Sequence, residues 1–237
     1  MTRSEAVKFI IIRSIGNFLV LFSLFGVLAT FGPVLYYEVQ FRVVQARGIH
    51  FVVGHQPTSA TQQKNTTAVP QEETTPGFAQ ILEGDKEQIL LPKDTQFSIV
   101  IPKIGASAKI SPNVDPGNQE AFLPILQKGI AHAQGSVFPG MQGNIYLFAH
   151  STDNWWNVGR YNAVFYLLRD LTLGDEIIVF FEERRYEYVV SQTIIADPND
   201  VSFLAQPHTG KEKLVLQTCW PPGTTWKRLY IIAVPKD

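Results

Sequence analysis

The sequence predicts an all-β domain, closed as a barrel or sandwich, behind an N-terminal membrane-spanning helix and a polar linker. Three observations support this architecture. The chain has an uncharged apolar segment near its N-terminus, then a polar stretch of low complexity, and from Gln96 short apolar runs separated by Gly, Pro, Asn and Asp. Because the chain has 237 residues, the part after the linker has room for one domain of roughly 140 residues with a single core.

The N-terminal apolar segment is predicted to cross a membrane. Residues 14–37 contain no charged side chain, and a helix of this length spans a hydrocarbon layer of about 30 Å. A buried core helix would show a polar face, which Asn17, Ser23 and Thr30 do not form. A cleaved signal peptide is the competing interpretation, but the apolar run is longer than a typical signal-peptide core. We therefore expect an uncleaved single-pass anchor.

The charges around this segment predict its orientation. Arg3, Lys8 and Arg13 precede it, whereas the first basic residue after it is Arg42. The positive-inside rule then places residues 1–13 in the cytoplasm and the rest of the chain on the outer face of the cell membrane.

Residues 38–95 are predicted to be a juxtamembrane segment and a flexible linker. Glu38–Arg47 consists of good helix formers and can continue the preceding helix beyond the membrane. Gly54–Gly77 is dominated by Thr, Gln, Pro, Ser and Glu, and it has too little apolar surface to offset the entropy of ordering. We expect it to be a tether that holds residues 96–237 off the membrane.

The β-rich part begins at residue 96 and contains seven runs that we predict to be strands. They are Phe97–Ile101, Ala108–Ser111, Asn144–Ala149, Glu176–Phe181, Arg185–Ile195, Leu214–Thr218 and Arg228–Val234. This number fits a closed barrel or a sandwich. Two short helical segments are also expected, at Val158–Leu168 and at Asp200–Ala205, where Asp200 can cap the helix.

Composition argues against several classes of function. The net charge of −1 and the lack of a basic run give no attraction to nucleic acid. Zinc is not expected, because the chain has one cysteine, scattered histidines and no His-Glu-x-x-His motif. No acidic cluster has the character of a calcium site. We expect no cofactor, with calcium activation left open.

Cys219 is the only cysteine in the chain, so it cannot form an intramolecular disulfide outside the cytoplasm. The ordinary alternative is an inert, buried cysteine that acts as a small hydrophobe. Its position argues against that interpretation, because it follows the apolar run Leu214–Thr218 and precedes the turn residues Pro221–Gly223. Reactive groups commonly lie where a strand ends in a loop. Cys219 is therefore our candidate nucleophile.

His150 and Arg228 are the candidate partners of this thiol. A thiol nucleophile needs a group that manages its proton and, for acyl transfer, a donor to the developing oxyanion. His150 closes the apolar strand that begins at Asn144, much as Cys219 closes its own strand. If Pro221–Trp226 forms a hairpin loop, Arg228 returns close to Cys219. The alternatives are a surface histidine for His150 and a solubilising edge charge for Arg228.

Two further groups allow more than one interpretation. His132 lies within a short apolar run, and we expect it to be a structural hydrogen bonder. Trp155 and Trp156 follow His150 in a polar stretch, where they can line a substrate groove or pack over the end of the barrel.

Several motifs resemble the sortases, membrane-anchored cysteine transpeptidases of the Gram-positive type of cell surface. Leu216–Cys219 resembles the signature Thr-Leu-x-Thr-Cys of this family, with Val215 in place of the first threonine. Gly143–His150 is similar to the run that ends in the histidine of the family, and Arg228 resembles the arginine that starts the last strand. The resemblance covers about residues 97–235. A departure is the short loop after Trp220, where housekeeping members have a longer one, so the subclass is not defined.

This resemblance implies a closed eight-stranded β-barrel with Cys219 as nucleophile, His150 as general acid and base, and Arg228 as stabiliser of the tetrahedral intermediate. It further implies that Thr218 helps to shape the oxyanion site and that Trp220 lies close to the substrate.

The implied activity is cleavage of a C-terminal sorting signal of a secreted protein through a thioester, followed by transfer to a cell-surface amine. The acceptor would be a cell-wall peptide or a pilin lysine. A cysteine endopeptidase with water as acceptor and a non-catalytic surface scaffold are the alternatives. The sequence does not define the sorting motif, the acceptor, the metal dependence or the oligomeric state.

Overall fold

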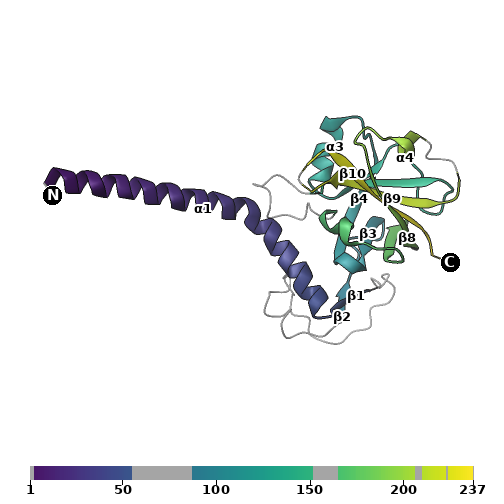
Figure 1. Ribbon diagram of the computed structural model, residues 1–237. Coiled ribbons are helices and arrows are strands. Elements are labelled where there is room, and N and C mark those ends of the chain that lie inside the picture. The colour runs from purple at the N-terminus through teal and green to yellow at the C-terminus, as the bar shows by residue number, and fades with distance from the viewer. Residues whose placement is uncertain (1–2, 55–86, 152–164, 206–209, 223, 237) are drawn as a thin grey trace, which may run out of the picture.

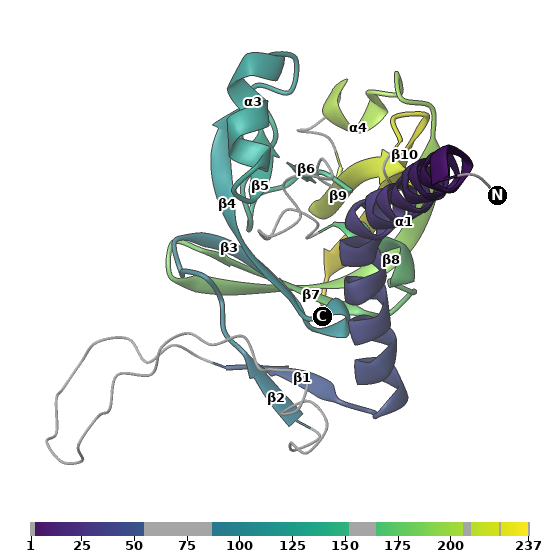
Figure 2. The same ribbon diagram turned by 90° about the vertical axis from the view of Figure 1, so that its left-hand side faces the viewer.

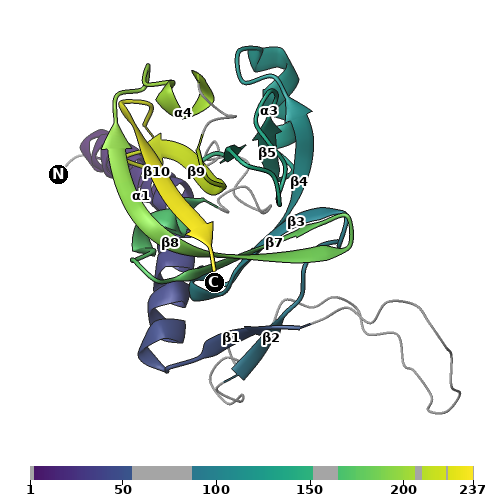
Figure 3. The ribbon, with the colours of Figure 1, turned by 90° about the vertical axis from the view of Figure 1, so that its right-hand side faces the viewer.

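The computed structural model describes residues 3–54, 87–151, 165–205, 210–222 and 224–236 (Figure 1). Eight strands form a closed barrel in the order β10-β8-β7-β3-β4-β5-β6-β9, so the predicted closed β-barrel is confirmed. Two strand pairs that matter for the site are β6 with β9, which is parallel, and β9 with β10, which is antiparallel. Figure 3 shows β10 between its two neighbours, β8 and β9.

The helices and strands have the following bounds. They are α1 Arg3–Ala46, β1 His50–Val53, β2 Glu87–Leu90, β3 Phe97–Ile101, η1 Pro102–Ile104, β4 Ala106–Val114, α3 Gln119–Leu126, β5 Ile130–Ala133, β6 Asn144–Phe148, η2 Tyr166–Asp170, β7 Glu176–Phe181, β8 Arg184–Ala196, α4 Ser202–Ala205, β9 Lys213–Trp220 and β10 Lys227–Pro235.

Two apolar clusters pack against opposite faces of β6, β9 and β10. The larger cluster includes Leu147, Leu216 and Ile231, all with no exposed surface, and it forms the main core. The second cluster lies on the other face of the same strands and is covered by α3 and α4. Burial on both faces explains why these strands read as continuous apolar runs and not as alternating ones.

All seven predicted strands are present, with ends that differ by no more than three residues from the prediction. The strand β5 was missed, because it has four residues, two of them alanine and one a buried histidine. The helix α3 was also missed. It contains Pro124, and its start is capped by Asn118, whose side-chain oxygen accepts a hydrogen bond from the Ala121 N–H.

The two expected helical segments have different outcomes. The predicted helix at Asp200–Ala205 is present as α4, and the Asp200 carboxylate accepts a hydrogen bond at 3.0 Å from the N–H of Ser202, the first residue of α4. Of the predicted helix Val158–Leu168, residues 158–164 lie outside the described part of the chain. The described part forms the 3-10 helix η2, which begins at Tyr166 and ends at Asp170.

The helix α1 combines the apolar segment with the predicted juxtamembrane helix. Its stretch Val7–Leu28 has a mean hydropathy of 2.0 and no buried part, so its length and composition suffice to cross a membrane. An N-terminal signal sequence would pass the same test, so the anchor over residues 14–37 stays a prediction. The helix continues as far as Ala46, which agrees with the expected helical character of Glu38–Arg47.

The end of α1 contacts the barrel (Figure 2). Phe41 is 9% exposed and belongs to the main core, and the Gln45 side chain donates a hydrogen bond to the Lys103 carbonyl oxygen at 3.2 Å. Arg42 lies 3.9 Å from the carboxylate of Asp170. The helix therefore packs against the domain that it precedes.

Part of the expected linker is ordered into a strand pair. The strand β1 pairs with β2 in parallel, with His50 opposite Glu87. The expected tether Gly54–Gly77 falls almost entirely on residues 55–86, which lie outside the described residues. The described ends of the expected linker, at Val53 and Glu87, therefore lie at opposite ends of this parallel pair.

Candidate active site

Cys219 and Arg228 face each other across the last hairpin of the barrel. Cys219 lies near the end of β9 and Arg228 near the start of β10, and the two are register partners in the antiparallel pair. The loop between the strands is residues 221–226, as the sequence predicted. The Arg228 Nη1 donates to the Cys219 Sγ at 3.6 Å, within hydrogen-bond range for sulfur.

Two backbone carbonyls hold the guanidinium of Arg228 in this position, one in the loop and one at the start of β10. Its Nη1 also lies 3.4 Å from the Thr225 carbonyl oxygen and 3.3 Å from that of Lys227. A guanidinium has five N–H donors and keeps its charge at any physiological pH. It therefore has donors left for a ligand while it contacts the sulfur.

The parallel pair of β6 and β9 brings His150 to the same end of the barrel. The last paired residues are Phe148 and Gln217, and the Ala149 N–H then donates to the Gln217 carbonyl oxygen at 3.2 Å. Continuing this register by two residues places His150 beside Cys219 on the neighbouring strand. Both residues are half-buried, so both combine support from the barrel with access to solvent.

The other three residues predicted for the site are Thr218, Trp220 and Trp155. Thr218 is 1% exposed, and its hydroxyl donates to the Ala149 carbonyl oxygen at 3.0 Å, so it does not face solvent. Trp220 is half-buried and packs against the main core. Trp155, with its neighbour Trp156, lies outside the described residues.

Two tyrosines near Arg228 were not predicted from the sequence. Tyr230 lies two residues after Arg228 on β10, and its ring centroid is 6.5 Å from that of Tyr146 on β6. Burial raises the pKa of both phenols. The nearby positive charge of Arg228 lowers the pKa of each, but by less than burial raises it. Both rings are therefore neutral at physiological pH. The alternation of side chains along β10 was the available signal for Tyr230.

His132 is a structural residue, as expected. Its ring is fully buried, contacts the Val137 carbonyl oxygen and the Ser136 hydroxyl through Nε2, and accepts from the Asn113 N–H through Nδ1. The ring also stacks on Phe138 with centroids 4.5 Å apart. Desolvation by burial lowers the pKa of His132, although the hydrogen bond to Val137 opposes this shift.

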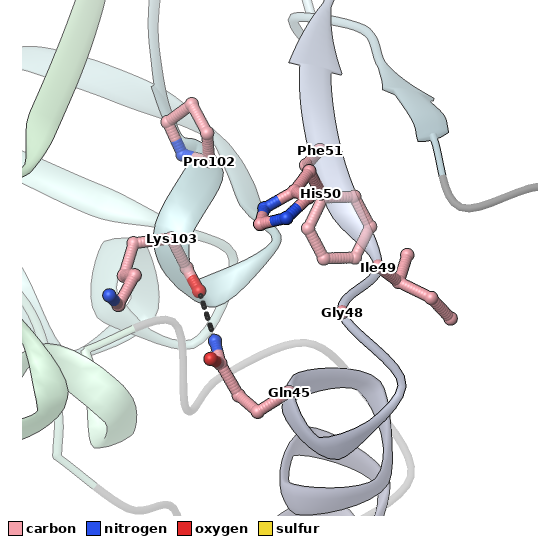
Figure 4. Close-up of a pocket in the computed structure, with 7 residues that line it drawn as sticks. All are labelled: Gln45, Gly48, Ile49, His50, Phe51, Pro102 and Lys103. Atoms are coloured by element: carbon pink, nitrogen blue, oxygen red, sulfur yellow. Dashed lines mark hydrogen bonds between the residues drawn. The ribbon is translucent and has the colours of Figure 1, made fainter.

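Other binding features lie apart from these residues. A cavity of about 150 Å³ is formed by the end of α1, by β1 and by η1, and it includes none of the predicted site residues (Figure 4). Among the described residues, no group of three His, Cys, Asp or Glu side chains is arranged to hold a metal ion.

The arrangement around Cys219 has the parts that thiol-based acyl transfer requires. The sulfur is a nucleophile, the imidazole one residue beyond Ala149 can take and return a proton, and the guanidinium can stabilise negative charge on an oxygen. The three groups come from β9, from the end of β6 and from β10, which are adjacent in the barrel.

Comparisons with known proteins agree with this fold. The family model described as "Sortase domain" matches residues 99–236, which is more than half of the chain. Sortase D of Bacillus subtilis (strain 168) is 30% identical over 121 residues, which cover 51% of this chain and 52% of the relative. The chain thus matches about half of the length of this curated relative.

Solved structures show the same likeness. Sortase C1 of Streptococcus agalactiae is 27% identical with a TM-score of 0.50, over 59% of this chain and 66% of that one. A sortase D5 transpeptidase of Clostridium perfringens is 24% identical with a TM-score of 0.48, over 61% of this chain and 80% of that one. From the match over residues 99–236, this chain belongs to the sortase family.

Proposed function

We propose that this protein is a membrane-anchored cysteine transpeptidase that cleaves a sorting signal of secreted proteins and transfers the new acyl end to an amine. The observation that carries the proposal is the contact of the Arg228 guanidinium with the Cys219 sulfur at 3.6 Å. Placement of His150 on the adjacent strand end adds the third group. Membership of the sortase family supports the same reaction class.

In the first half-reaction the Cys219 thiol passes its proton to His150, and the sulfur attacks the carbonyl carbon of the scissile peptide bond. A carbon–sulfur bond forms, and the carbonyl electron pair moves to the oxygen, whose negative charge the Arg228 guanidinium stabilises. The tetrahedral intermediate then collapses and the carbon–nitrogen bond breaks. His150 gives a proton to the departing amine, which leaves a thioester between the substrate and Cys219.

In the second half-reaction an incoming amine attacks the thioester carbon. His150 accepts the proton that the amine loses, a new amide bond forms, and the sulfur of Cys219 leaves with its electron pair. The chemistry is redox-neutral, and protein side chains supply each proton. We therefore propose a reaction without a cofactor, on the basis of what these three groups can do.

We further propose that the domain acts on the outer face of the cell membrane with the N-terminus in the cytoplasm. The apolar stretch of α1 supports a single-pass anchor, and the basic residues before it support the orientation. Substrates would be secreted proteins with a sorting signal, and acceptors would be cell-wall peptide or pilin amines. We propose no nucleic-acid partner, since the net charge is −1.

The experiment that tests this function traps the acyl-enzyme. The full-length chain in detergent is mixed with a library of sorting-signal peptides, and intact mass followed by peptide mapping locates the adduct. We expect a thioester on Cys219 that names the residue before the cleaved bond, and no adduct in Cys219→Ala. Processing that continues in Cys219→Ala would contradict the proposal and leave the scaffold alternative.

A second arm separates transfer from hydrolysis. The same reactions are run with and without short amine acceptors, such as glycine and lysine peptides. Transfer predicts a ligated product whose yield rises with the amine concentration. Hydrolysis that no amine alters would identify the endopeptidase alternative.

A further inference from the structure

The buried hydroxyl of Thr218 lies on the opposite side of β9 from the sulfur of Cys219. Alternation along β9 places Thr218 on the face of Leu216, which belongs to the main core, whereas Cys219 lies on the other face. The Thr218 side chain is 1% exposed. A polar group in such surroundings is costly unless it forms a hydrogen bond, and valine would fill the same volume without that cost.

The partner of this hydroxyl is the carbonyl oxygen of the residue before His150. Thr218 Oγ1 donates to the Ala149 oxygen at 3.0 Å, while the Ala149 N–H donates to the Gln217 oxygen at 3.2 Å. In a continued parallel ladder the Ala149 oxygen would instead accept from the N–H of Cys219. The side-chain hydrogen bond from Thr218 thus takes the place of the next backbone hydrogen bond between β6 and β9, at the point where the chain leaves β6.

Both backbone polar groups of Ala149 are therefore fixed to β9, one in the peptide unit before its Cα and one in the peptide unit after it. Because a peptide unit is planar, fixing the Ala149 carbonyl also fixes the direction in which the chain enters His150. The position of the imidazole relative to the sulfur depends on that direction. A displacement of about 1 Å in a reacting group can cost on the order of 10²-fold in rate.

We propose that Thr218 is a positioning residue, whose hydroxyl clamps the Ala149 carbonyl and so holds His150 beside Cys219. This inference rests on the proposed function, because it gives His150 and Cys219 their catalytic roles. It replaces the oxyanion role expected for Thr218, since the hydroxyl donates its proton to Ala149.

The test compares Thr218→Val, which keeps the shape and removes the hydroxyl, with Thr218→Ser, which keeps the hydroxyl. We expect Val to lower kcat at least tenfold with KM within twofold of the wild type, and Ser to restore kcat to within threefold. Thermal unfolding of each full-length variant in detergent controls for folding. A Val variant with kcat within threefold of the wild type would overturn the clamp, as would Ser and Val variants that lose kcat equally.

A second readout needs no substrate and so stands apart from the proposed function. The rate at which iodoacetamide alkylates Cys219 is measured from pH 5 to pH 9 in the wild type, in Thr218→Val, in His150→Ala and in the double variant. We expect Val to change the pH profile in the presence of His150 and to have no effect in the His150→Ala background. An equal effect in both backgrounds would show that Thr218 does not act through His150.

If the wild type forms no acyl-enzyme while this coupling is observed, the proposed function fails and the clamp stands. If the acyl-enzyme forms without the coupling, the clamp fails and the function stands.

Discussion

Arg228 brings a fixed positive charge to the point where β9 and β10 meet the loop at residues 221–226. Its contacts with the Cys219 sulfur and with two backbone carbonyls hold the guanidinium before any substrate arrives. A donor that is already oriented needs no reorganisation when charge develops on the substrate oxygen. The loss of the Arg228 guanidinium should therefore lower mainly kcat.

Replacement of Arg228 by alanine should lower kcat by ~10²-fold or more, the loss typical of removing one oxyanion donor. Lys227→Ala is the matched control, because Lys227 is exposed, adjacent in sequence and equally charged. We expect this control to stay within twofold of the wild type in a peptide-cleavage assay. A loss of less than threefold for Arg228→Ala would show that the guanidinium has no such role.

His132 should make the stability of the fold depend on pH. Burial lowers its pKa in the folded protein, whereas the unfolded chain has an ordinary value of about 6.5. The unfolded state therefore binds the proton more readily, and the free energy of unfolding should fall as the pH drops below about 6.5, by up to about 1.4 kcal/mol per pH unit.

Denaturant unfolding at pH 7.5, 6.5 and 5.5 measures this effect. His132→Gln cannot titrate and should show a smaller loss of stability between pH 6.5 and pH 5.5 than the wild type. His50→Gln, at an exposed position of β1, is the control and should keep the wild-type dependence. Equal pH dependence in all three proteins would remove His132 as the cause.

At the residue level, the sequence predicted the contact between Cys219 and Arg228 but not the contact of Thr218. Strand-end positions and the hairpin length predicted that Arg228 would return to Cys219, and the register confirms it. The role of Thr218 could not be predicted, because it depends on β6 and β9 being parallel neighbours 69 positions apart in sequence. Only the fold brings Ala149 to that hydroxyl.

Among the elements, the end of α1 differs most from the expected flexible connection, because it packs against the barrel. Phe41 packs into the main core, and the Gln45 side chain bonds to η1 (Figure 4). Phe41→Ala should lower the free energy of unfolding by about 3 kcal/mol, as expected for a buried phenylalanine. Val39→Ala, on the same helix at 52% exposure, should change it by less than about 0.5 kcal/mol.

These two variants are compared by denaturant unfolding of the full-length chain in detergent. Equal stability of the Phe41→Ala and Val39→Ala variants would show that the helix does not contribute to the core. A selective loss in Phe41→Ala would mean that the barrel and the end of α1 form one structural unit.

The hairpin between β7 and β8 carries backbone strain that a substitution can relieve. Its two loop residues, Glu182 and Glu183, have φ values of 48° and 64°, in the left-handed region that asparagine and glycine tolerate best. The double variant Glu182→Asn, Glu183→Gly should therefore stabilise the fold by about 1 kcal/mol. Differential scanning calorimetry measures the change in Tm.

The control for this turn is the double variant Glu182→Ala, Glu183→Ala, which removes the same two charges but keeps a Cβ atom at both positions. We expect no gain in Tm from this variant. A gain as large as that of the Asn-Gly double variant would attribute the effect to charge and not to backbone conformation.

The elements that were predicted correctly are those with a clear local sequence pattern. Glu176–Phe181 was predicted with its observed ends, because a continuous apolar run is bounded by turn residues. The short strand β5 has no such signal, and it exists because β4 and β6 flank it in the barrel. The helix α3 forms although it contains Pro124, a residue that disfavours helices, because it packs against the second cluster.

For the molecule as a whole, the strand order is what brings the three proposed functional groups together. Residues at positions 150, 219 and 228 come from strands that are neighbours only in the order β6-β9-β10. That order includes one parallel pair between strands distant in sequence. Composition and alternation predicted a closed β domain, but they could not predict which strands would be neighbours.

The most direct test of this account asks whether His150 lies beside Cys219. In the variant His150→Cys the chain contains two cysteines, on neighbouring strands about 4.8 Å apart, within the range that a disulfide spans. After mild oxidation of the full-length chain in detergent, thiol titration and intact mass under non-reducing conditions are measured. The account predicts an intramolecular disulfide in monomeric protein; two free thiols in a folded chain would contradict it.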